Sequence, residues 1–488
     1  MRIGIISSVY PPEGTSGGNA AFFYELANAL VQQGHEVLVA TLTNGESRTE
    51  EIRGVRVERV SFNSADYFNF SLMPWFAGLA WNLPRAVELY RKLKSVVNDF
   101  APDVIECVDN GFEGLIWSID SSYPLVLRSV CPQFHTINLG FHQQDLVDKE
   151  LVCALEVLAL RAATSITTPS RSMANIIATA CGIDIDSIRI IRNPLSMNDA
   201  PSQASHVTES RSAGELKLLY IGRIEKLKGC DILVEALPTV LKAFPLAKIQ
   251  FVGSPSPIPG TDVTFADILK VRLTELGLLD HCSFSGAVPR EQLGQYSTEA
   301  DICVFPSRYD SSPYACLEAM SRGAAVIASN AGGIPEYVED GLSGILFQSE
   351  DSADLARKII ELGSNKAQLE KIRSSASQHV KKLCAPDTVA QQSVELYEEA
   401  IKLHKEKVPQ KKNTTASQDK VLSHFFRAFD DWSNEPYLRK LIDEKISYTW
   451  QEGYKQGFND ARKQLSIRNR LVNKLKRTIG IDQSNLDK

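Results

Sequence analysis

The sequence lacks long apolar runs, paired-cysteine motifs and any excess of basic charge. No stretch approaches the roughly 18 uninterrupted apolar residues that a membrane-spanning helix needs. The nine cysteines form no CxxC pair, and such a scattered set is typical of reduced thiols rather than of disulfides or a zinc site. Lys and Arg number 53 against 59 Asp and Glu, so no protein-wide basic field exists to hold nucleic acid. We therefore expect a cytoplasmic protein without a nucleic-acid partner.

The first residues do not resemble a signal peptide either. The opening run, MRIGIISSVYPPEG, has a short apolar part and no small-residue cleavage site, so we predict a first β-strand there. The GxGxxG pattern of dinucleotide-binding folds is missing after this strand, which argues against an NAD-dependent dehydrogenase. The 488 residues are 43% hydrophobic and 23% charged. These values are typical of a globular chain with about two to four domains.

Short apolar runs alternate with helical patterns through the first part of the chain. The first strand ends in a glycine loop that includes Gly17 and Gly18, and a helical pattern then runs to Gly34. Further runs of strand length lie at 35–42, 103–108, 124–130 and 165–170. Strands that alternate with helices predict a parallel sheet covered on both faces. We therefore predict an α/β domain over residues 1–197.

A polar stretch at 192–215, rich in Ser, Pro and Ala, predicts a linker between domains. The alternation of strands and helices then restarts and predicts a second α/β domain over 215–385. Residues 386–404 have the pattern of a closing helix. They are followed by a lysine-rich linker at 405–419 and by a helical tail at 420–488.

The tail has a composition of its own. Residues 420–460 hold nine aromatic side chains, and residues 461–480 hold seven Arg or Lys, no acid, and apolar residues at near-helical spacing. A basic amphipathic helix can rest on an anionic membrane surface, or it can dock on its own protein or on a second copy. Both interpretations of 461–480 stay open, so peripheral membrane contact and an oligomer contact are both expectations.

Two cations follow the strand predicted at 216–222. Arg223 comes directly after Gly222, and Lys228 precedes Gly229, where a helical pattern begins. Ligands of doubly wound sheets bind beyond the carboxyl ends of the strands. A guanidinium, an ammonium and the N–H groups of a helix start all suit a pyrophosphate. The alternative is a pair of solvated surface charges.

Two acidic residues follow the strand predicted at 302–307. Asp310 lies in a loop, and Ser312-Pro313 predicts the start of a helix that ends at Gly323, with Glu318 about a turn and a half inside. A carboxylate in the loop can hold sugar hydroxyls, and one farther back can hold a ribose. The alternative for Glu318 is an ion pair with Arg322 at i,i+4.

A pair of glycines follows the next predicted strand. Gly332 and Gly333 allow the backbone to approach a ligand closely, and Glu336 would then face the same crevice. The alternative is a plain turn.

Taken in chain order, the cations, the two acids and the glycine pair resemble the motifs of the family 4 retaining glycosyltransferases, known as glycosyl transferases group 1. The Gly17-Gly18 loop and Asn193-Pro194 extend the resemblance over roughly residues 1 to 400. The resemblance implies the GT-B fold, an α/β architecture of two Rossmann-like domains that face each other across a cleft. It implies a nucleoside diphosphate sugar, with UDP or GDP, bound mainly by the second domain, an acceptor bound mainly by the first, and neither a cofactor nor a metal ion.

The resemblance also implies a role for individual residues. Arg223 and Lys228 would neutralise the donor diphosphate and stabilise the leaving nucleotide. Glu318 would hold the ribose, and Asp310 would contact sugar hydroxyls at a place where the family most often has Glu.

The same resemblance assigns further residues to donor binding. Gly17 and Gly18 would approach the diphosphate and the sugar. Tyr314, Gly333 and Glu336 complete the expected donor site.

One position departs from the family pattern. Where relatives have a His near the reacting carbon, the strand at 124–130 ends in Val130. His135, five residues farther on, enters the site only if its loop folds back, and the alternative is a solvated His. We include His135 among the candidate catalytic residues. Val130 keeps open both an unusual acceptor geometry and a loss of activity.

Residues 63–90 hold seven aromatic side chains between predicted strands. Aromatic rings stack on sugar faces or form small apolar cores, and both interpretations stay open. The leading hypothesis is a metal-independent retaining hexosyltransferase of polysaccharide biosynthesis that acts on a glycan or lipid-linked acceptor. A noncatalytic glycan-binding or assembly subunit with a retained fold is the alternative.

Overall fold

The computed structural model describes residues 1–13, 18–62, 77–139, 146–196, 214–258 and 261–407. Gly17, residues 63–76 of the aromatic stretch, residues 197–213 of the predicted interdomain linker and the whole tail at 420–488 lie outside the described residues. The helical C-terminal extension and the contacts expected of 461–480 therefore stay predictions. In the part of the chain that is described, no helix has the length and apolar content to cross a membrane.

The first domain is built on an eight-stranded sheet with the strand order β3-β4-β2-β1-β5-β6-β7-β8. The strands are β1 (Arg2–Ile6), β2 (Glu36–Thr43), β3 (Arg48–Ile52), β4 (Val55–Ser61), β5 (Val104–Val108), β6 (Leu125–Arg128), β7 (Ser165–Thr168) and β8 (Ile188–Ile190). All neighbouring pairs are parallel except β3 and β4. The parallel α/β pattern predicted from the sequence is therefore confirmed for the central strands.

The antiparallel strand β3 was not predicted, because its sequence RTEEI has no apolar run. It pairs with β4 through the turn at Arg53 and Gly54, whose φ angles are 53° and 82°. Positive φ at both central residues is the geometry of a tight hairpin turn. A charged, half-exposed strand suits the edge of a sheet, where it discourages pairing with other chains.

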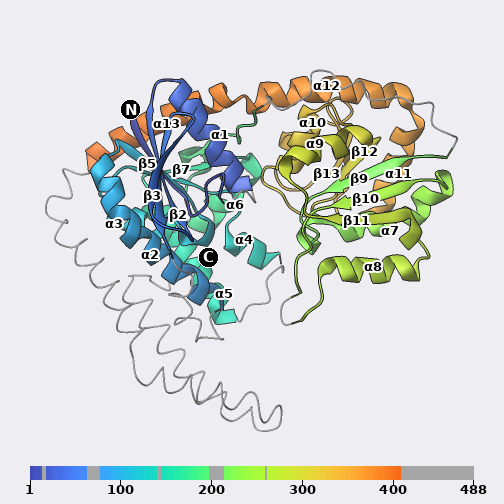
Figure 1. The fold of residues 1–488 in the computed structure, drawn as a ribbon, viewed down its shortest axis with the longest axis horizontal. Helices are drawn as coiled ribbons and strands as arrows, with labels where there is room; N and C mark the ends of the chain where they lie inside the picture. The colour runs from blue at the N-terminus through green and yellow to red at the C-terminus, as the bar shows by residue number, and fades with distance from the viewer. Residues whose placement is uncertain (14–17, 63–76, 140–145, 197–213, 259–260, 408–488) are drawn as a thin grey trace, which may run out of the picture.

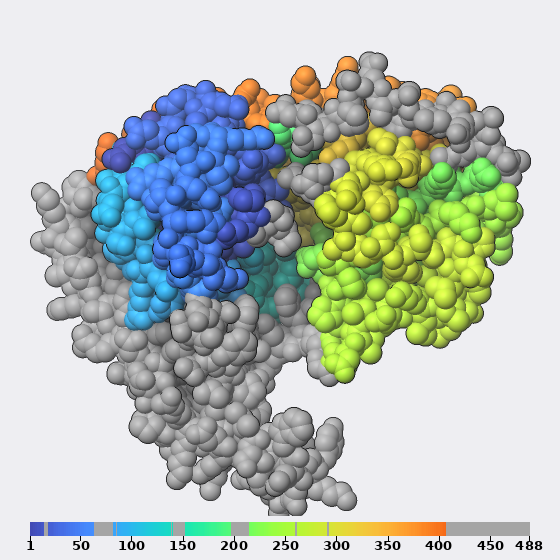
Figure 2. Space-filling view, in the orientation of Figure 1, coloured from blue at the N-terminus to red at the C-terminus, as the bar shows by residue number. Residues whose placement is uncertain are grey.

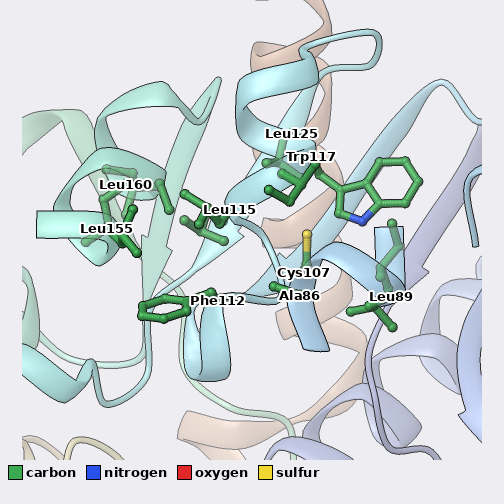
Figure 3. Packing of buried hydrophobic residues seen from close by; sticks show 14 of the residues in the cluster. Ala86, Leu89, Cys107, Phe112, Leu115, Trp117, Leu125, Leu155 and Leu160 are labelled. Carbon is green, nitrogen blue, oxygen red and sulfur yellow. The ribbon is translucent and has the colours of Figure 1, made fainter. Parts of the chain in front are cut away.

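Helices cover both faces of this sheet. They are α1 (Gly18–Gln32), α2 (Ala77–Phe100), α3 (Leu115–Asp120), α4 (Gln133–Asn138), α5 (Leu146–Ala162) and α6 (Arg171–Cys181). One face packs against α2, α3 and α5, where Cys107, Leu125 and Trp117 meet in the core shown in Figure 3. The aromatic ring of Tyr90 belongs to this core and lies edge-on to Trp117 at 4.9 Å. Tyr90 therefore supports the apolar-core interpretation for its part of 63–90.

The second domain has a six-stranded, wholly parallel sheet with the order β11-β10-β9-β12-β13-β14. Its strands are β9 (Lys217–Ile221), β10 (Lys248–Val252), β11 (Cys282–Gly286), β12 (Ile302–Phe305), β13 (Val326–Ser329) and β14 (Ile345–Phe347). Its helices are α7 (Cys230–Ala243), α8 (Phe265–Glu275), α9 (Arg290–Glu299), α10 (Tyr314–Ser321), α11 (Ser352–Ser364) and α12 (Lys366–Cys384). The two domains form separate lobes, coloured blue to cyan and green to yellow in Figure 2.

The last described helix, α13 (Pro386–Lys407), returns from the second domain to the first. Figure 1 shows α12 and α13 in orange, running along the top of both lobes. Val389, Val394 and Tyr397 of α13 enter the same core as Ile3 and Phe22, on the sheet face that α1 also covers. The chain therefore links its two domains twice, once between β8 and β9 and once through α13.

A buried ion pair holds α13 on the first sheet. Arg128 Nε of β6 lies 2.6 Å from Glu106 Oε1 of β5, and both side chains are fully buried. The Tyr397 hydroxyl donates to the other oxygen of Glu106, and the Arg128 guanidinium lies 4.1 Å from the ring centroid of Phe22. The strands β5 and β6 and the helices α1 and α13 therefore all contact this one ion pair.

We predict that Arg128→Met lowers the free energy of unfolding by about 3–5 kcal/mol, because it leaves the Glu106 carboxylate buried without its cation. Arg189→Met is the matched control, since Arg189 also pairs with α13, through Glu399, but both side chains are about half exposed. That change should cost at most about 1 kcal/mol. Chemical denaturation followed by circular dichroism measures both, and equal losses would contradict the role of the buried pair.

Candidate active site

An ion pair joins two loops at the carboxyl edge of the second sheet. Lys228 ends the short helix η4 (Lys226–Lys228) after β9, and Asp310 follows β12, the parallel neighbour of β9. Lys228 Nζ lies 2.6 Å from Asp310 Oδ2, with 23% and 17% of the two side chains exposed. The structure therefore brings together two candidate residues that are 82 positions apart.

Gly229 allows these two loops to touch through the main chain. Its φ is 67°, and a Cβ at this position would lie 1.8 Å from the carbonyl oxygen of Pro306. No other residue fits such a contact without a shift of the backbone. The glycine that follows Lys228 thus fixes how closely the Lys228 turn approaches the Asp310 loop.

Arg223 lies between β9 and η4, in the same connection as Lys228, and is largely exposed. Its Nη1 is 2.8 Å from Glu225 Oε2, and 63% of its side chain is accessible. The carbonyl of Arg223 accepts a hydrogen bond from the Tyr220 hydroxyl at 2.6 Å. The backbone at Arg223 is thereby fixed, while the guanidinium remains open to an anionic ligand.

Helix α10 carries two of the donor-site candidates. It begins at Tyr314, one residue later than predicted, because Pro313 has a non-helical ψ of 75° and occupies the cap position. The Tyr314 hydroxyl donates to the carbonyl of Pro194 at 3.1 Å, and a Cβ on Gly18 would lie 3.3 Å from the Tyr314 ring. Tyr314 therefore lies against the first domain. Glu318 is half-buried, and its carbonyl accepts from Arg322.

On the first domain, Asp109 lies where β5 ends. Its carboxylate accepts from the Ser129 hydroxyl and, at 3.3 Å, from the backbone N–H of Val130. Burial raises the pKa of Asp109 to about 6, and these hydrogen bonds oppose the rise. The sequence interpretation missed Asp109, although an acid in the connection after a buried strand is the kind of signal that identified Asp310.

A second buried acid, Glu156 of α5, caps the start of α4. Its two oxygens accept from the N–H groups of Gln133 and Phe134 at 2.7 and 2.8 Å. Burial, and then the charge of Asp109, raise the pKa of Glu156 to about 8. Sequence reasoning missed Glu156 because it lies within an amphipathic helix.

Cys131 lies where the two domains' charged groups come together. Burial raises the pKa of its thiol to about 12; the Lys228 ammonium opposes this, and the carboxylates of Asp109, Asp310 and Glu156 add to it. Charged groups of both domains therefore affect the pKa of the Cys131 thiol. The ends of β5 and β6 and the Lys228–Asp310 pair form one electrostatic environment.

His135 lies on α4, against the residue that precedes Asp310. Its ring is 4.2 Å from the Tyr309 ring in an edge-on arrangement, and its Nε2 is buried without a hydrogen-bond partner. Burial lowers the pKa of His135, which favours the neutral ring. His135 thus reaches the junction between the domains through an aromatic contact.

Gly333 and Glu336 also lie at this junction. The Glu336 carboxylate accepts from the N–H groups of Arg171 and Ser172 at 2.8 and 2.9 Å, at the start of α6 in the first domain. A Cβ on Gly333 would lie 2.3 Å from the carbonyl oxygen of Ser311 and 2.8 Å from Ser170. In the structure, both residues contact protein rather than an open crevice.

Among the described residues, no group of three or more His, Cys, Asp or Glu could hold a metal ion.

The candidate site consists of Lys228, Asp310 and Arg223 in the second domain. Asp109 and Val130 of the first domain lie across the domain junction, where the carbonyl of Val130 accepts from Ser311.

Comparison with protein families decides the family. The model of the glycosyl transferases group 1 matches residues 203–379, and that of glycosyltransferase family 4 matches residues 16–198. The chain belongs to the group 1, family 4 glycosyltransferases. Its activity class is therefore glycosyl transfer, and its two parallel-sheet domains are those of the GT-B fold.

Two relatives match this glycosyltransferase over most of their length. An uncharacterized glycosyltransferase of Methanocaldococcus jannaschii is 26% identical over 83% of this chain and 99% of its own. The glycogen synthase of Mycobacterium tuberculosis is 26% identical over 81% of this chain and 94% of its own.

Two solved structures share the fold. Sucrose-phosphate synthase of Thermosynechococcus elongatus has a TM-score of 0.64 at 20% identity, covering 82% of this chain and 98% of its own. HepE of Anabaena, solved with UDP and glucose, has a TM-score of 0.60 at 21% identity, covering 81% and 99%.

We predict that the glycosyltransferase loses stability between pH 5 and pH 8 through Glu156. The unfolded side chain ionises near 4.5, whereas the folded one keeps its proton to about 8. Over this range the folded state holds more protons, so each pH unit costs up to about 1.4 kcal/mol. Glu156→Gln should flatten this fall in the thermal unfolding temperature. Glu361→Gln, at an exposed carboxylate, should leave it unchanged. Parallel curves for wild type and Glu156→Gln would contradict the shift.

A separate prediction concerns the contact of Glu336 with α6. Glu336→Ala should speed hydrogen exchange at the first amides of α6 by about fivefold to 30-fold, since losing a cap costs about 1–2 kcal/mol. Glu339→Ala, three residues away and exposed, is the control. Mass spectrometry of exchanged peptides measures both, and unchanged exchange in Glu336→Ala would show that the contact does not form in solution.

Proposed function

We propose that this glycosyltransferase moves a hexose-type unit from a nucleoside diphosphate sugar to a glycan or lipid-linked acceptor, with retention of configuration and without a metal ion. The observation that carries the proposal is the Lys228–Asp310 pair at the carboxyl edge of β9 and β12. This edge is where doubly wound sheets bind nucleotides. Retention and metal independence come from the family resemblance.

The cations suit a departing diphosphate. Negative charge on the nucleotide grows as the bond to the sugar breaks, so cations already in place stabilise the transition state more than the bound donor. Lys228 provides a partly buried ammonium and Arg223 an exposed guanidinium on the same turn. Together they supply the charge compensation that a divalent ion provides in other enzymes.

Asp310 has two roles in this proposal. Without donor, it compensates the charge of Lys228 at 2.6 Å. A diphosphate would replace it as the partner of Lys228, and the freed carboxylate would then accept hydrogen bonds from the sugar hydroxyls. Glu318, half-buried on α10, is proposed to hold the ribose.

The acceptor is proposed to enter from the first domain, toward the end of β6. Asp109, with a pKa raised to about 6, and the backbone of Val130 lie there. HepE was solved with UDP and glucose, and several relatives are named D-inositol 3-phosphate glycosyltransferase. The UDP bound to HepE supports a nucleotide-sugar donor, and the choice between UDP and GDP is left to experiment.

Val130 favours the second candidate, a noncatalytic glycan-binding or assembly subunit. An aliphatic side chain lies where the family usually has His, and its carbonyl accepts from the Ser311 hydroxyl of the second domain. A donor-hydrolysis assay separates the two functions. Release of UDP or GDP would exclude the noncatalytic subunit.

We predict that calorimetry detects binding of UDP or GDP and that Lys228→Ala lowers kcat for transfer by about 100- to 1,000-fold. That loss is typical when one preorganised group on a developing charge is removed. Lys242→Ala, at an exposed lysine in the last turn of α7, is the control and should retain full activity. No binding of either nucleotide, or unchanged transfer by Lys228→Ala, would refute the proposal.

A further inference from the structure

Arg308 ties the loop of Asp310 to the turn of Lys228. It lies two residues before Asp310, and its backbone N–H donates to the carbonyl of Leu227 at 2.8 Å. Its Nη1 also donates to the carbonyl of Lys226. Both carbonyls belong to η4, the short helix that Lys228 ends. The loop and the turn are therefore joined on the main chain as well as by the Lys228–Asp310 pair.

The same guanidinium forms a fork with the start of α7. Nη1 and Nη2 of Arg308 lie 2.8 and 2.9 Å from the two carboxylate oxygens of Asp231. Nε donates to Glu350 at 2.7 Å. Only 12% of the Arg308 side chain is exposed, against 58% for Glu350. A bidentate pair fixes direction as well as distance, which a lysine cannot reproduce.

These contacts leave Lys228 little freedom. On one side, Gly229 presses against the carbonyl of Pro306, where a Cβ would approach to 1.8 Å. On the other side, the carbonyls of Lys226 and Leu227 are bonded to Arg308. The separation between Lys228 and Asp310 is therefore set by groups on both sides of the turn.

We propose that Arg308 is a positioning residue for glycosyl transfer, which holds Lys228 and Asp310 at the separation that the donor diphosphate and sugar require. The inference rests on the function proposed above for those two residues. Four of the five guanidinium N–H groups are bonded to protein, so Arg308 acts through its neighbours rather than on the donor.

Arg308→Lys tests the proposal because it keeps the charge and removes the fork. We expect kcat to fall by about 100-fold, as for a catalytic group displaced by about 1 Å. The KM for the donor should change by less than about threefold, because the lost contacts act mainly in the transition state. Arg272→Lys is the matched control, since Arg272 makes the same kind of fork with Glu235 of α7, at 2.7 and 3.1 Å, on the exposed surface. It should leave both constants unchanged.

A double variant shows whether Arg308 acts through Lys228. In a Lys228→Ala background, Arg308→Lys should lower kcat by less than about twofold, because the separation between Lys228 and Asp310 that Arg308 sets no longer exists. If Arg308→Lys does not fold, Asp231→Asn removes one end of the same fork, and the same losses are expected. Unchanged kcat in the folded single variant, or additive losses in the double variant, would overturn this inference alone. A wild type without any transfer would overturn the proposed function and the inference with it.

Discussion

The buried pair of Glu106 and Arg128 is the interaction on which the arrangement of the two domains depends. Two opposite charges without solvent are tolerated only when they are paired and hydrogen-bonded, and here Tyr397 of the returning helix supplies one of those bonds. The pair therefore holds α13 against the first sheet. Asp109 and Val130 lie at the ends of the same two strands, so the helix contact and the acceptor side share one scaffold.

Four consecutive residues of the second domain, 308–311, connect this scaffold to the candidate site. Arg308 bonds to the Lys228 turn of its own domain, and Tyr309 packs on His135 of the first domain. Asp310 pairs with Lys228, and the Ser311 hydroxyl donates to the carbonyl of Val130. Alternate side chains thus face alternate domains. The position of Asp310 is consequently coupled to the packing of the first domain, and any opening of the junction would move it.

The sequence was a good guide to most of the strands, although β4 and β8 lie outside the predicted runs. Apolar runs located the central strands to within one to three residues, and residue types after the strands identified Lys228 and Asp310 as separate candidates, whereas their ion pair appears only in the structure. It failed where the signal depends on a partner. Strand β3 forms because β4 offers an edge, and its own sequence is charged. Glu156 has the pattern of an ordinary helical acid, yet it caps another helix in the interior.

Glu336 shows which features the sequence predicts and which features only the tertiary structure decides. Its sequence motif predicted a residue at the carboxyl edge of the second sheet, and Glu336 lies near that edge. Its carboxylate, however, accepts from the start of a helix 165 residues away. Sequence alone determined two α/β domains, because the periodicity of strands and helices depends only on residues that are close together in the chain. Tertiary structure alone decided which charges compensate each other and which domain each side chain faces. Those choices depend on burial and on distances between segments that are remote in the chain.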